Sequence, residues 1–183
     1  GGESKILVMD ALSRYNSFSS NLLATVQLTP NLWKNETLVA WYHLLKRQAE
    51  IPNRATQLKQ TETILRSRVN FQGSLMNLQN EGDWEGRWQL LTSNDQEALG
   101  VFRIFMDEKD WGQDAGRMAR GLIARLRLGH WDTTMANAWG LTQFRYFSEK
   151  FEKETIRGET KIQAGEIVDL FNWRSTPKGD RKL

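Results

Sequence analysis

The chain has 183 residues, a formal net charge of +3 and no cysteine. The lack of cysteine excludes disulfides, thiolate metal sites and cysteine nucleophiles. Basic residues alternate with acidic ones over most of the sequence, and no apolar run is long enough to cross a bilayer. We therefore expect no nucleic-acid partner and no membrane contact by this chain. The first residues lack the pattern of a signal peptide, so we expect any export signal of a parent protein to lie outside the chain.

Apolar residues at helical spacing predict a mainly helical first half. A weak pattern covers about 4–15, and its apolar stripe is formed by Val8, Ala11, Leu12 and Tyr15. A stronger pattern covers about 35–49 and is expected to be capped by Asn35. The apolar face of this second helix is formed by Leu38, Trp41, Tyr42, Leu45 and Ala49. Weaker helices are predicted over about 54–66 and around Trp84, Trp88 and Leu91.

Two helices are predicted in the middle of the chain. Ser-Asn-Asp-Gln at 93–96 has the form of a capping box, and an apolar face follows it over about 93–106. The next helix, over about 114–128, has a single apolar stripe and leaves Arg120 and Arg127 for solvent. This one-sided pattern is typical of an outer helix.

The last predicted helix, over about 133–150, has two apolar stripes. A surface helix needs only one stripe, so we expect this helix to be buried on most of its circumference, with Trp139 and Phe144 nearly buried. An outer helix is thus followed by an inner helix. Since the connections are short, the neighbours are expected to be antiparallel.

The connection between these two helices is the most distinctive stretch of the sequence. It reads Gly-His-Trp-Asp-Thr-Thr-Met-Ala-Asn-Ala-Trp-Gly at 129–140. We expect Gly129 to end the preceding helix in a left-handed conformation, and Asp132 or Thr133 to cap the next one. The stretch contains no plausible reaction centre, so we interpret it as a packing signature, a set of residues whose role is to pack the two helices together.

The C-terminal part changes character. Short β-prone runs broken by Gly158 and Gly165 predict strands within 153–174. Two or three strands cannot bury a face alone, so this segment is expected to begin a further β module. Residues 175–183 are expected to form a flexible basic tail, and 1–152 to form one helical domain.

Little in the sequence supports catalysis. His43 and His130 are the two histidines, and no known nucleophile, phosphate-binding or metal motif occurs, so we expect no metal and no cofactor. One enzymatic alternative stays open, because α/α barrels include glycosidases that use paired carboxylates beside tryptophans. The acidic residues near Trp84, Trp111 or Trp131 are Asp83, Glu85, Asp110, Asp114 and Asp132. These acids also fit helix caps, and the tryptophans also fit core filling.

Four segments of the chain resemble the later part of large bacterial alpha-2-macroglobulin-like proteins. The segments are 66–73, 110–122, 129–140 and 147–152. Their order and spacing agree over about 29–162, and Trp-Asp-Thr-Thr-x-x-Asn-Ala-Trp at 131–139 is the most specific element. The motif residues carried over are Gly129, Trp131, Asp132, Thr133, Thr134, Asn137 and Trp139.

This resemblance implies a fold and a function. The fold is part of an α/α toroid of inner and outer helices, the thioester-type domain, followed by the start of a β-rich module. Thr134 and Asn137 would hydrogen-bond helix ends, and Trp131 and Trp139 would fill the space between layers. The parent would be a periplasmic or cell-envelope protease inhibitor, whose partners are proteases and its own other domains. Many members carry a Cys-x-x-Gln thioester, which here either lies upstream or does not exist, because this chain has no cysteine.

Overall fold

A computed structural model describes residues 1–79, 93–152, 158–164 and 167–172. The described chain is mainly helical with short antiparallel strand pairs, which confirms the predicted fold class at that level. The helix predicted around 84–91 and the basic tail 175–183 lie outside the described residues. Contacts divide the chain into two units, Gly1–Phe144 and Arg145–Leu183.

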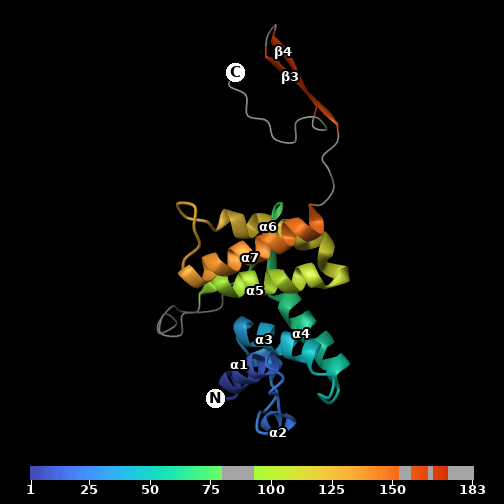
Figure 1. Ribbon diagram of the computed structural model, residues 1–183, viewed down its shortest axis with the longest axis vertical. Coiled ribbons are helices and arrows are strands. Elements are labelled where there is room, and N and C mark those ends of the chain that lie inside the picture. Colours follow the sequence, from blue (N-terminus) through green and yellow to red (C-terminus); the bar gives the residue numbers. More distant parts are fainter. Residues whose placement is uncertain (80–92, 153–157, 165–166, 173–183) are drawn as a thin grey trace. The chain divides into compact units, whose positions relative to one another are not determined.

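The elements follow one another as Figure 1 shows. In chain order they are α1 (Gly2–Ser13), α2 (Ser20–Leu23), η1 (Pro30–Leu32), α3 (Asn35–Arg47), α4 (Arg54–Ser67), β1 (Val69–Gln72), β2 (Leu75–Leu78), α5 (Asn94–Asp107), η3 (Lys109–Trp111), α6 (Gly112–Ala124), α7 (Thr134–Phe151), β3 (Glu159–Ala164) and β4 (Ile167–Asn172).

Helix α3 is the centre of the first unit. It packs against α1, α4 and α5, and Leu38 and Trp41 are fully buried. The sequence predicted a one-sided helix, but Val39 and Leu44 on its other sides are buried as well, because three helices surround it. Ala49 lies beyond the end of α3 and is exposed.

The expected cap of α3 was also wrong. Lys34 is the N-cap residue, and Asn35 is the first residue of the helix. The Asn35 side chain is buried because it accepts a hydrogen bond from Arg68 (2.9 Å) and donates one to Glu97 (3.3 Å). It therefore connects three helical segments.

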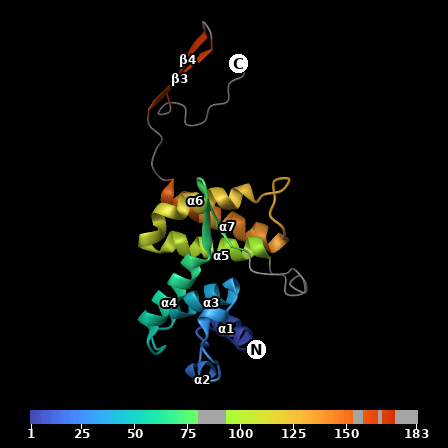
Figure 2. The same cartoon turned by 180° about the vertical axis from the view of Figure 1, so that it is seen from behind.

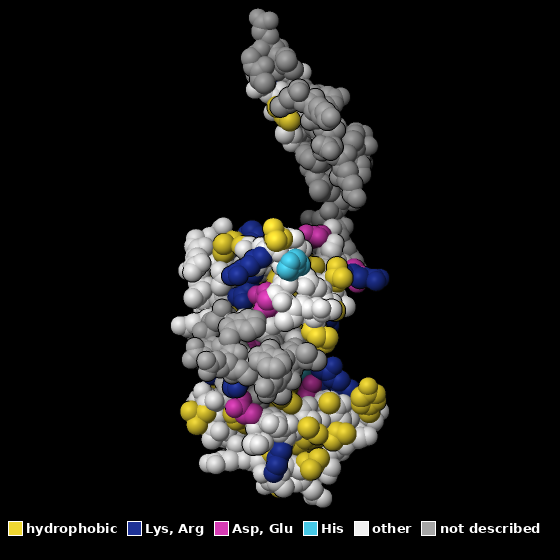
Figure 3. Space-filling model, turned by 90° about the vertical axis from the view of Figure 1, so that its left-hand side faces the viewer, with side chains coloured by type: hydrophobic (Ala, Val, Ile, Leu, Met, Phe, Trp, Pro, Cys, Tyr) yellow, Lys and Arg dark blue, Asp and Glu magenta, His cyan; other side chains and the backbone are white. Residues whose placement is uncertain are grey.

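Helix α1 buries the side opposite to the predicted stripe. Val8 and Tyr15 are exposed, at 55% and 81% of their surface, whereas Asp10 and Ser13 are buried. Ile6 and Met9 are buried on the same side, and Arg47 of α3 hydrogen-bonds both Asp10 and Ser13, which makes burial of these polar side chains possible. Hydrophobic side chains are correspondingly visible on the lower half of the face in Figure 3, the half that holds α1 and α2.

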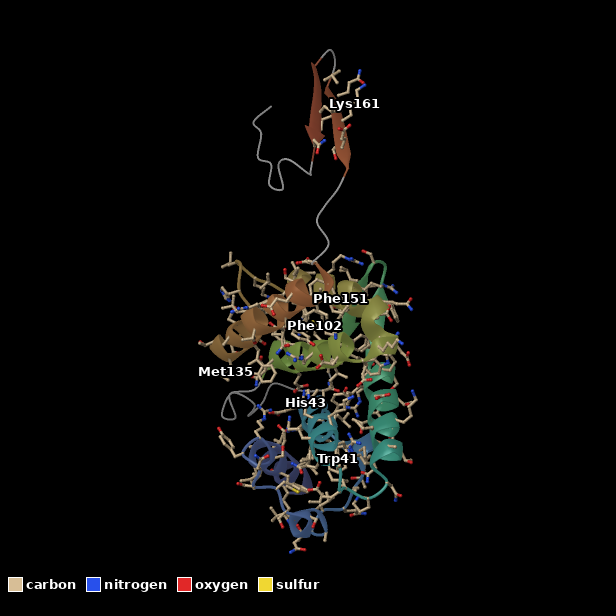
Figure 4. All side chains as sticks on the ribbon, turned by 45° about the vertical axis from the view of Figure 1, so that its right-hand side comes forward. Trp41, His43, Phe102, Met135, Phe151 and Lys161 are labelled. Carbon is tan, nitrogen blue, oxygen red and sulfur yellow. The ribbon has the colours of Figure 1, made fainter. Side chains whose placement is uncertain are left out.

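Helices α5, α6 and α7 lie side by side, and the chain reverses direction at each connection (Figures 1 and 2). Phe102 of α5 lies between α5 and α7 (Figure 4), and its ring centroid is 5.4 Å from that of Phe144. The arginines Arg120 and Arg127 are exposed, as the one-stripe pattern predicts.

The prediction that α7 is an inner helix was wrong. Leu141 is 75% exposed, and Trp139 and Phe144 are only partly buried. The buried side of α7 is instead a narrow row of Ala136, Gly140 and Gln143. Two apolar stripes indicate which surfaces of a helix are apolar, but only the neighbouring segments decide which of these surfaces is covered.

The hairpin of β1 and β2 was not predicted. Its two-residue turn is Gly73-Ser74, with Gly73 at a φ of +59° that favours glycine. The hairpin packs on α6, where Gly121 has no room for a β-carbon because the carbonyl oxygen of Met76 lies there. Arg117 and Arg120 donate hydrogen bonds to the carbonyls of the turn (3.2 and 3.3 Å).

In the second unit, β3 and β4 pair antiparallel, from Glu159 opposite Asn172 to Ala164 opposite Ile167. Both strands lie within the segment 153–174 for which strands were predicted. Ile162 and Leu170 are exposed on this hairpin.

Candidate functional site

The connection between α6 and α7 begins with a tight turn. Helix α6 ends at Ala124, four residues before the predicted end, so Gly129 is not the residue that ends it. Leu128 (φ 52°) and Gly129 (φ 83°) are instead the two central residues of a turn that is closed by backbone hydrogen bonds between Arg127 and His130 (2.9 and 3.1 Å). Two successive residues with positive φ are typical of a type I′ turn.

Trp131 follows this turn and is buried. Its indole N–H donates to the carbonyl oxygen of Leu122 (3.0 Å) near the end of α6. Its ring stacks against Phe144 at 5.8 Å and lies so close to Gly140 that a β-carbon there would overlap the indole. Gly140 thus allows the ring of Trp131 to lie directly on the backbone of α7.

Asn137 holds the backbone of Trp131. Its side-chain oxygen accepts from the Trp131 N–H, and its side-chain nitrogen donates to the Trp131 carbonyl oxygen, both at 3.0 Å. The same nitrogen donates to the carbonyl oxygen of Thr133 (2.6 Å). One side chain therefore satisfies backbone groups on both sides of the helix start.

Thr133 supplies the cap of α7. Its hydroxyl accepts a hydrogen bond from the N–H of Ala136 (3.1 Å), which is the bond expected of an N-cap residue. Thr134, which the resemblance assigned to a helix-end hydrogen bond, is the first residue of α7 and is exposed.

Asp132 connects this turn with the start of α5. Its N–H donates to a carboxylate oxygen of Asp95 (3.0 Å), and Asp95 forms an ion pair with Arg125 (2.6 Å). Asp132 is exposed as a residue, but partial desolvation of its carboxyl group raises the pKa; a hydrogen bond with Ser93 opposes this, and the negative charge of Asp95 adds to it. Ser93 in turn caps α5 by accepting from the N–H of Gln96 (3.1 Å). Asp132, Asp95, Arg125 and Ser93 thus interact with one another at this end of the three helices.

Trp139 lies apart from this cluster. It is half-buried and lines a pocket between α1, α3 and α5. The structure therefore brings together Gly129, Trp131, Asp132, Thr133 and Asn137, and it places Trp139 in a different environment.

Arginines in another segment that carries the resemblance, 66–73, also make contacts that hold the fold together. Arg68 is buried and donates to the carbonyl oxygen of Trp33 (2.8 Å) and to Asn35. Arg66 forms an ion pair with Asp114, and its guanidinium lies 5.6 Å from the ring centroid of Trp111. Sequence reasoning missed these contacts, because arginines on a polar helix face ordinarily indicate solvent exposure.

Among the described residues, the tryptophans that the enzymatic alternative pairs with acids are covered. Trp111 and Trp131 are buried, so neither presents an open ring face for stacking. Asp114 is engaged with Arg66 and Arg117, and Asp110 is exposed. Asp83, Glu85 and Trp84 lie outside the described residues.

No group of histidine, aspartate and glutamate side chains that could hold a metal ion occurs within the described residues. None of the helices in this part of the chain combines the length and apolar character that crossing a membrane requires. Comparison with protein-family models, curated proteins and solved structures found no match to this chain.

Proposed function

We propose that this chain is a non-catalytic scaffold module of a bacterial alpha-2-macroglobulin-like protease-trapping inhibitor. The observation that carries the proposal is the use of the 129–140 stretch, the most specific element of the resemblance. Trp131, Asn137 and Gly140 fix the backbone at the start of α7, and their polar atoms bond to the chain itself. We call this arrangement, in which side chains fix how α7 follows α6, a structural joint.

The proposed fold within the parent is part of an α/α toroid. Support comes from the antiparallel succession of α5, α6 and α7 and from the burial of α3 among its neighbours, since a toroid is built from such helical hairpins. The β3–β4 hairpin would begin the β-rich module that follows, because an isolated hairpin is marginally stable on its own.

In this proposal the parent is periplasmic or attached to the cell envelope. A protease would cut a bait segment elsewhere in the parent, and the resulting rearrangement would enclose it. The partners of this chain are then the other domains of the parent and, through them, proteases. The carbohydrate-active alternative has less support because the rings of Trp111 and Trp131 are covered.

Small-angle X-ray scattering on the parent protein tests the proposal. The parent is measured before and after exposure to an active protease, and after exposure to the same protease with its nucleophile blocked. We expect a smaller radius of gyration only after exposure to the active protease. Equal values in all three states, with the bait demonstrably cut, would rule out a trap.

A further inference from the structure

The register of the β1–β2 hairpin determines which backbone groups point away from it. Gln72 and Leu75 flank the two-residue turn and form a hydrogen-bonded pair. At the other end of the hairpin, the N–H of Gln79 donates to the carbonyl oxygen of Arg68 (2.7 Å). Hydrogen-bonded and non-hydrogen-bonded pairs alternate along an antiparallel ladder. The intervening residues, 69 and 71 in β1 and 76 and 78 in β2, therefore direct their N–H and C=O groups outward.

The outer edge of β2 is covered, whereas the outer edge of β1 is open. The hairpin, green in Figure 2, packs on α6 through β2, and the carbonyl oxygen of Met76 lies against Gly121 of that helix. The outward backbone groups of Val69 and Phe71 have no hydrogen-bond partner within the described part of the chain. Phe71 is also 51% exposed. An open edge of this kind is a template for a further strand.

Positive charge lies next to the open edge. The guanidinium of Arg117 lies over the Phe71 ring, 4.3 Å from its centroid. Arg117 and Arg66 share one carboxylate, that of Asp114, and Arg120 has no acidic partner among the residues that the structure describes. The hairpin itself contains no acidic residue. A strand added beside β1 would therefore meet an excess of positive charge, which an acidic side chain would complement.

Strand pairing indicates where that acidic side chain would lie. In an added antiparallel strand, the residue opposite Phe71 would exchange both backbone hydrogen bonds with it. The side chain of that residue would lie on the same face as the Phe71 ring, with the two β-carbons about 5 Å apart. Arg117 lies over this ring, so an acidic side chain at this position would be near its guanidinium. Two positions further along, the added strand would lie opposite the half-buried Val69, which favours an aliphatic side chain.

A second copy of this chain is a poorer occupant of the edge than an acidic strand. Pairing of β1 with the β1 of another copy would bring the Arg117 and Arg120 side chains of both copies to one sheet. Like charges at such short range repel each other, and the hairpin supplies no acid to offset them.

We propose that the open edge of β1 binds an extended acidic segment of a partner polypeptide, which adds a third, antiparallel strand to the hairpin. The backbone groups of Val69 and Phe71 bond to the added strand, and an acidic side chain opposite Phe71 lies beside Arg117. This mode of recognition is β-augmentation, in which main-chain hydrogen bonds supply affinity and side chains supply specificity. The inference is independent of the protease-trap proposal, because it concerns binding by the isolated chain.

Titration followed by ¹H–¹⁵N NMR tests this proposal at pH 7 and low ionic strength. The probe is the blocked peptide acetyl-Thr-Glu-Thr-Val-Thr-amide, which places its Glu opposite Phe71 and its Val opposite Val69. We expect saturable downfield shifts and slower hydrogen exchange at the backbone amides of Val69 and Phe71. Unchanged amide signals at saturating peptide would overturn the proposal. Shifts of the same amides that depend on protein concentration without peptide would assign the edge to a second copy and would also overturn it.

Two control peptides separate charge from backbone pairing. Replacing the Glu of the peptide by Gln keeps the shape and removes the charge, so affinity should fall about two- to fivefold. N-methylation of the Glu keeps the charge but removes the N–H that would donate to Phe71, so binding should be lost. Equal affinity of the Glu and Gln peptides, or undiminished binding of the N-methylated peptide, would contradict the proposal.

Matched variants of the protein locate the charge. Arg117→Gln should weaken binding of the Glu peptide about two- to fivefold and leave the affinity for the Gln peptide unchanged. Arg14→Gln is the control, because Arg14 likewise shares a carboxylate, that of Asp10, with a second arginine, but lies on α1. It should bind both peptides as the wild type does. An Arg117 variant with wild-type preference for the Glu peptide would overturn the assignment, and the peptide comparison decides the proposal if this variant does not fold.

Discussion

The side-chain amide of Asn137 pairs with the backbone of Trp131 in the way that a neighbouring β-strand would. It accepts from the N–H and donates to the carbonyl oxygen of the same residue, both at 3.0 Å. Because Trp131 also bonds to Leu122, this pairing links the start of α7 to the end of α6. The link depends on one polar side chain, so it can be removed by one substitution.

The first prediction concerns this pairing. Asn137→Ala should lower the free energy of unfolding by about 1–2 kcal/mol, because it leaves backbone groups of Trp131 without partners. Thr133→Ala should cost about 1 kcal/mol through the lost cap of α7. Thr134→Ala is the matched control, since Thr134 is exposed, and should change stability by less than about 0.5 kcal/mol. Urea denaturation of the three variants measures these differences. A Thr134 variant as unstable as the Thr133 variant would contradict the assignment of the cap.

The second prediction concerns pH. Burial lowers the pKa of His43 from 6.5 to about 4 in the folded chain; the negative charge of Asp10 opposes this shift, and the positive charges of Arg47 and Arg14 add to it. The unfolded chain therefore takes up the proton first as the pH falls below about 6.5. The stabilisation by the neutral imidazole is complete above that pH and is lost toward pH 4. This group should lower the free energy of unfolding by about 2 kcal/mol between pH 7 and pH 5.

The matching measurement is urea denaturation at pH 7 and pH 5 for the wild type, His43→Gln and His130→Gln. His43→Gln should remove most of the pH dependence in this window. His130→Gln alters the exposed histidine of the turn and should keep it. If the His43 variant retained the full dependence, burial of this histidine would not be its source.

The third prediction concerns chemistry. The chain alone should gain no mass on incubation with methylamine, because a thioester requires a cysteine sulfur and the sequence has none. It should also leave an added protease active and glycans intact. Intact-mass spectrometry and hydrolysis assays test these points. Glycan cleavage that disappears in Asp132→Asn would favour the carbohydrate-active alternative over the scaffold.

Local patterns in the sequence predicted the helices well and their burial poorly. Periodicity located α3 and α7, but it assigned the inner position to α7, whereas α3 is the helix that three others surround. In α1 the buried side carries Ile6 and Met9 together with Asp10 and Ser13, and the partner of these two polar residues, Arg47, lies 34 or more residues away in the chain. Long-range partners of this kind leave no local signal.

The 129–140 stretch was recognisable as a packing signature, yet its contacts were only partly predictable. The cap at Thr133 follows from local rules. The stacking of Trp131 on Gly140 depends on how the turn folds back onto α7. The β1–β2 hairpin had a readable signal, since Val-Asn-Phe-Gln before Gly73-Ser74 alternates in polarity and ends in a hairpin turn. The pocket at Trp139 combines four helices, so no single segment indicates it.

Two glycine-to-alanine variants test most directly whether the 129–140 stretch is a structural joint. Gly140→Ala and Gly116→Ala both add a methyl group within a helix, but a β-carbon at Gly140 overlaps the ring of Trp131, whereas one at Gly116 meets only Arg120, at 3.8 Å. In urea denaturation, Gly140→Ala should lower the free energy of unfolding by about 1–3 kcal/mol through overpacking. Gly116→Ala should raise it by about 0.5–1 kcal/mol, because alanine favours the helix. Equal or higher stability of Gly140→Ala relative to Gly116→Ala would contradict the account.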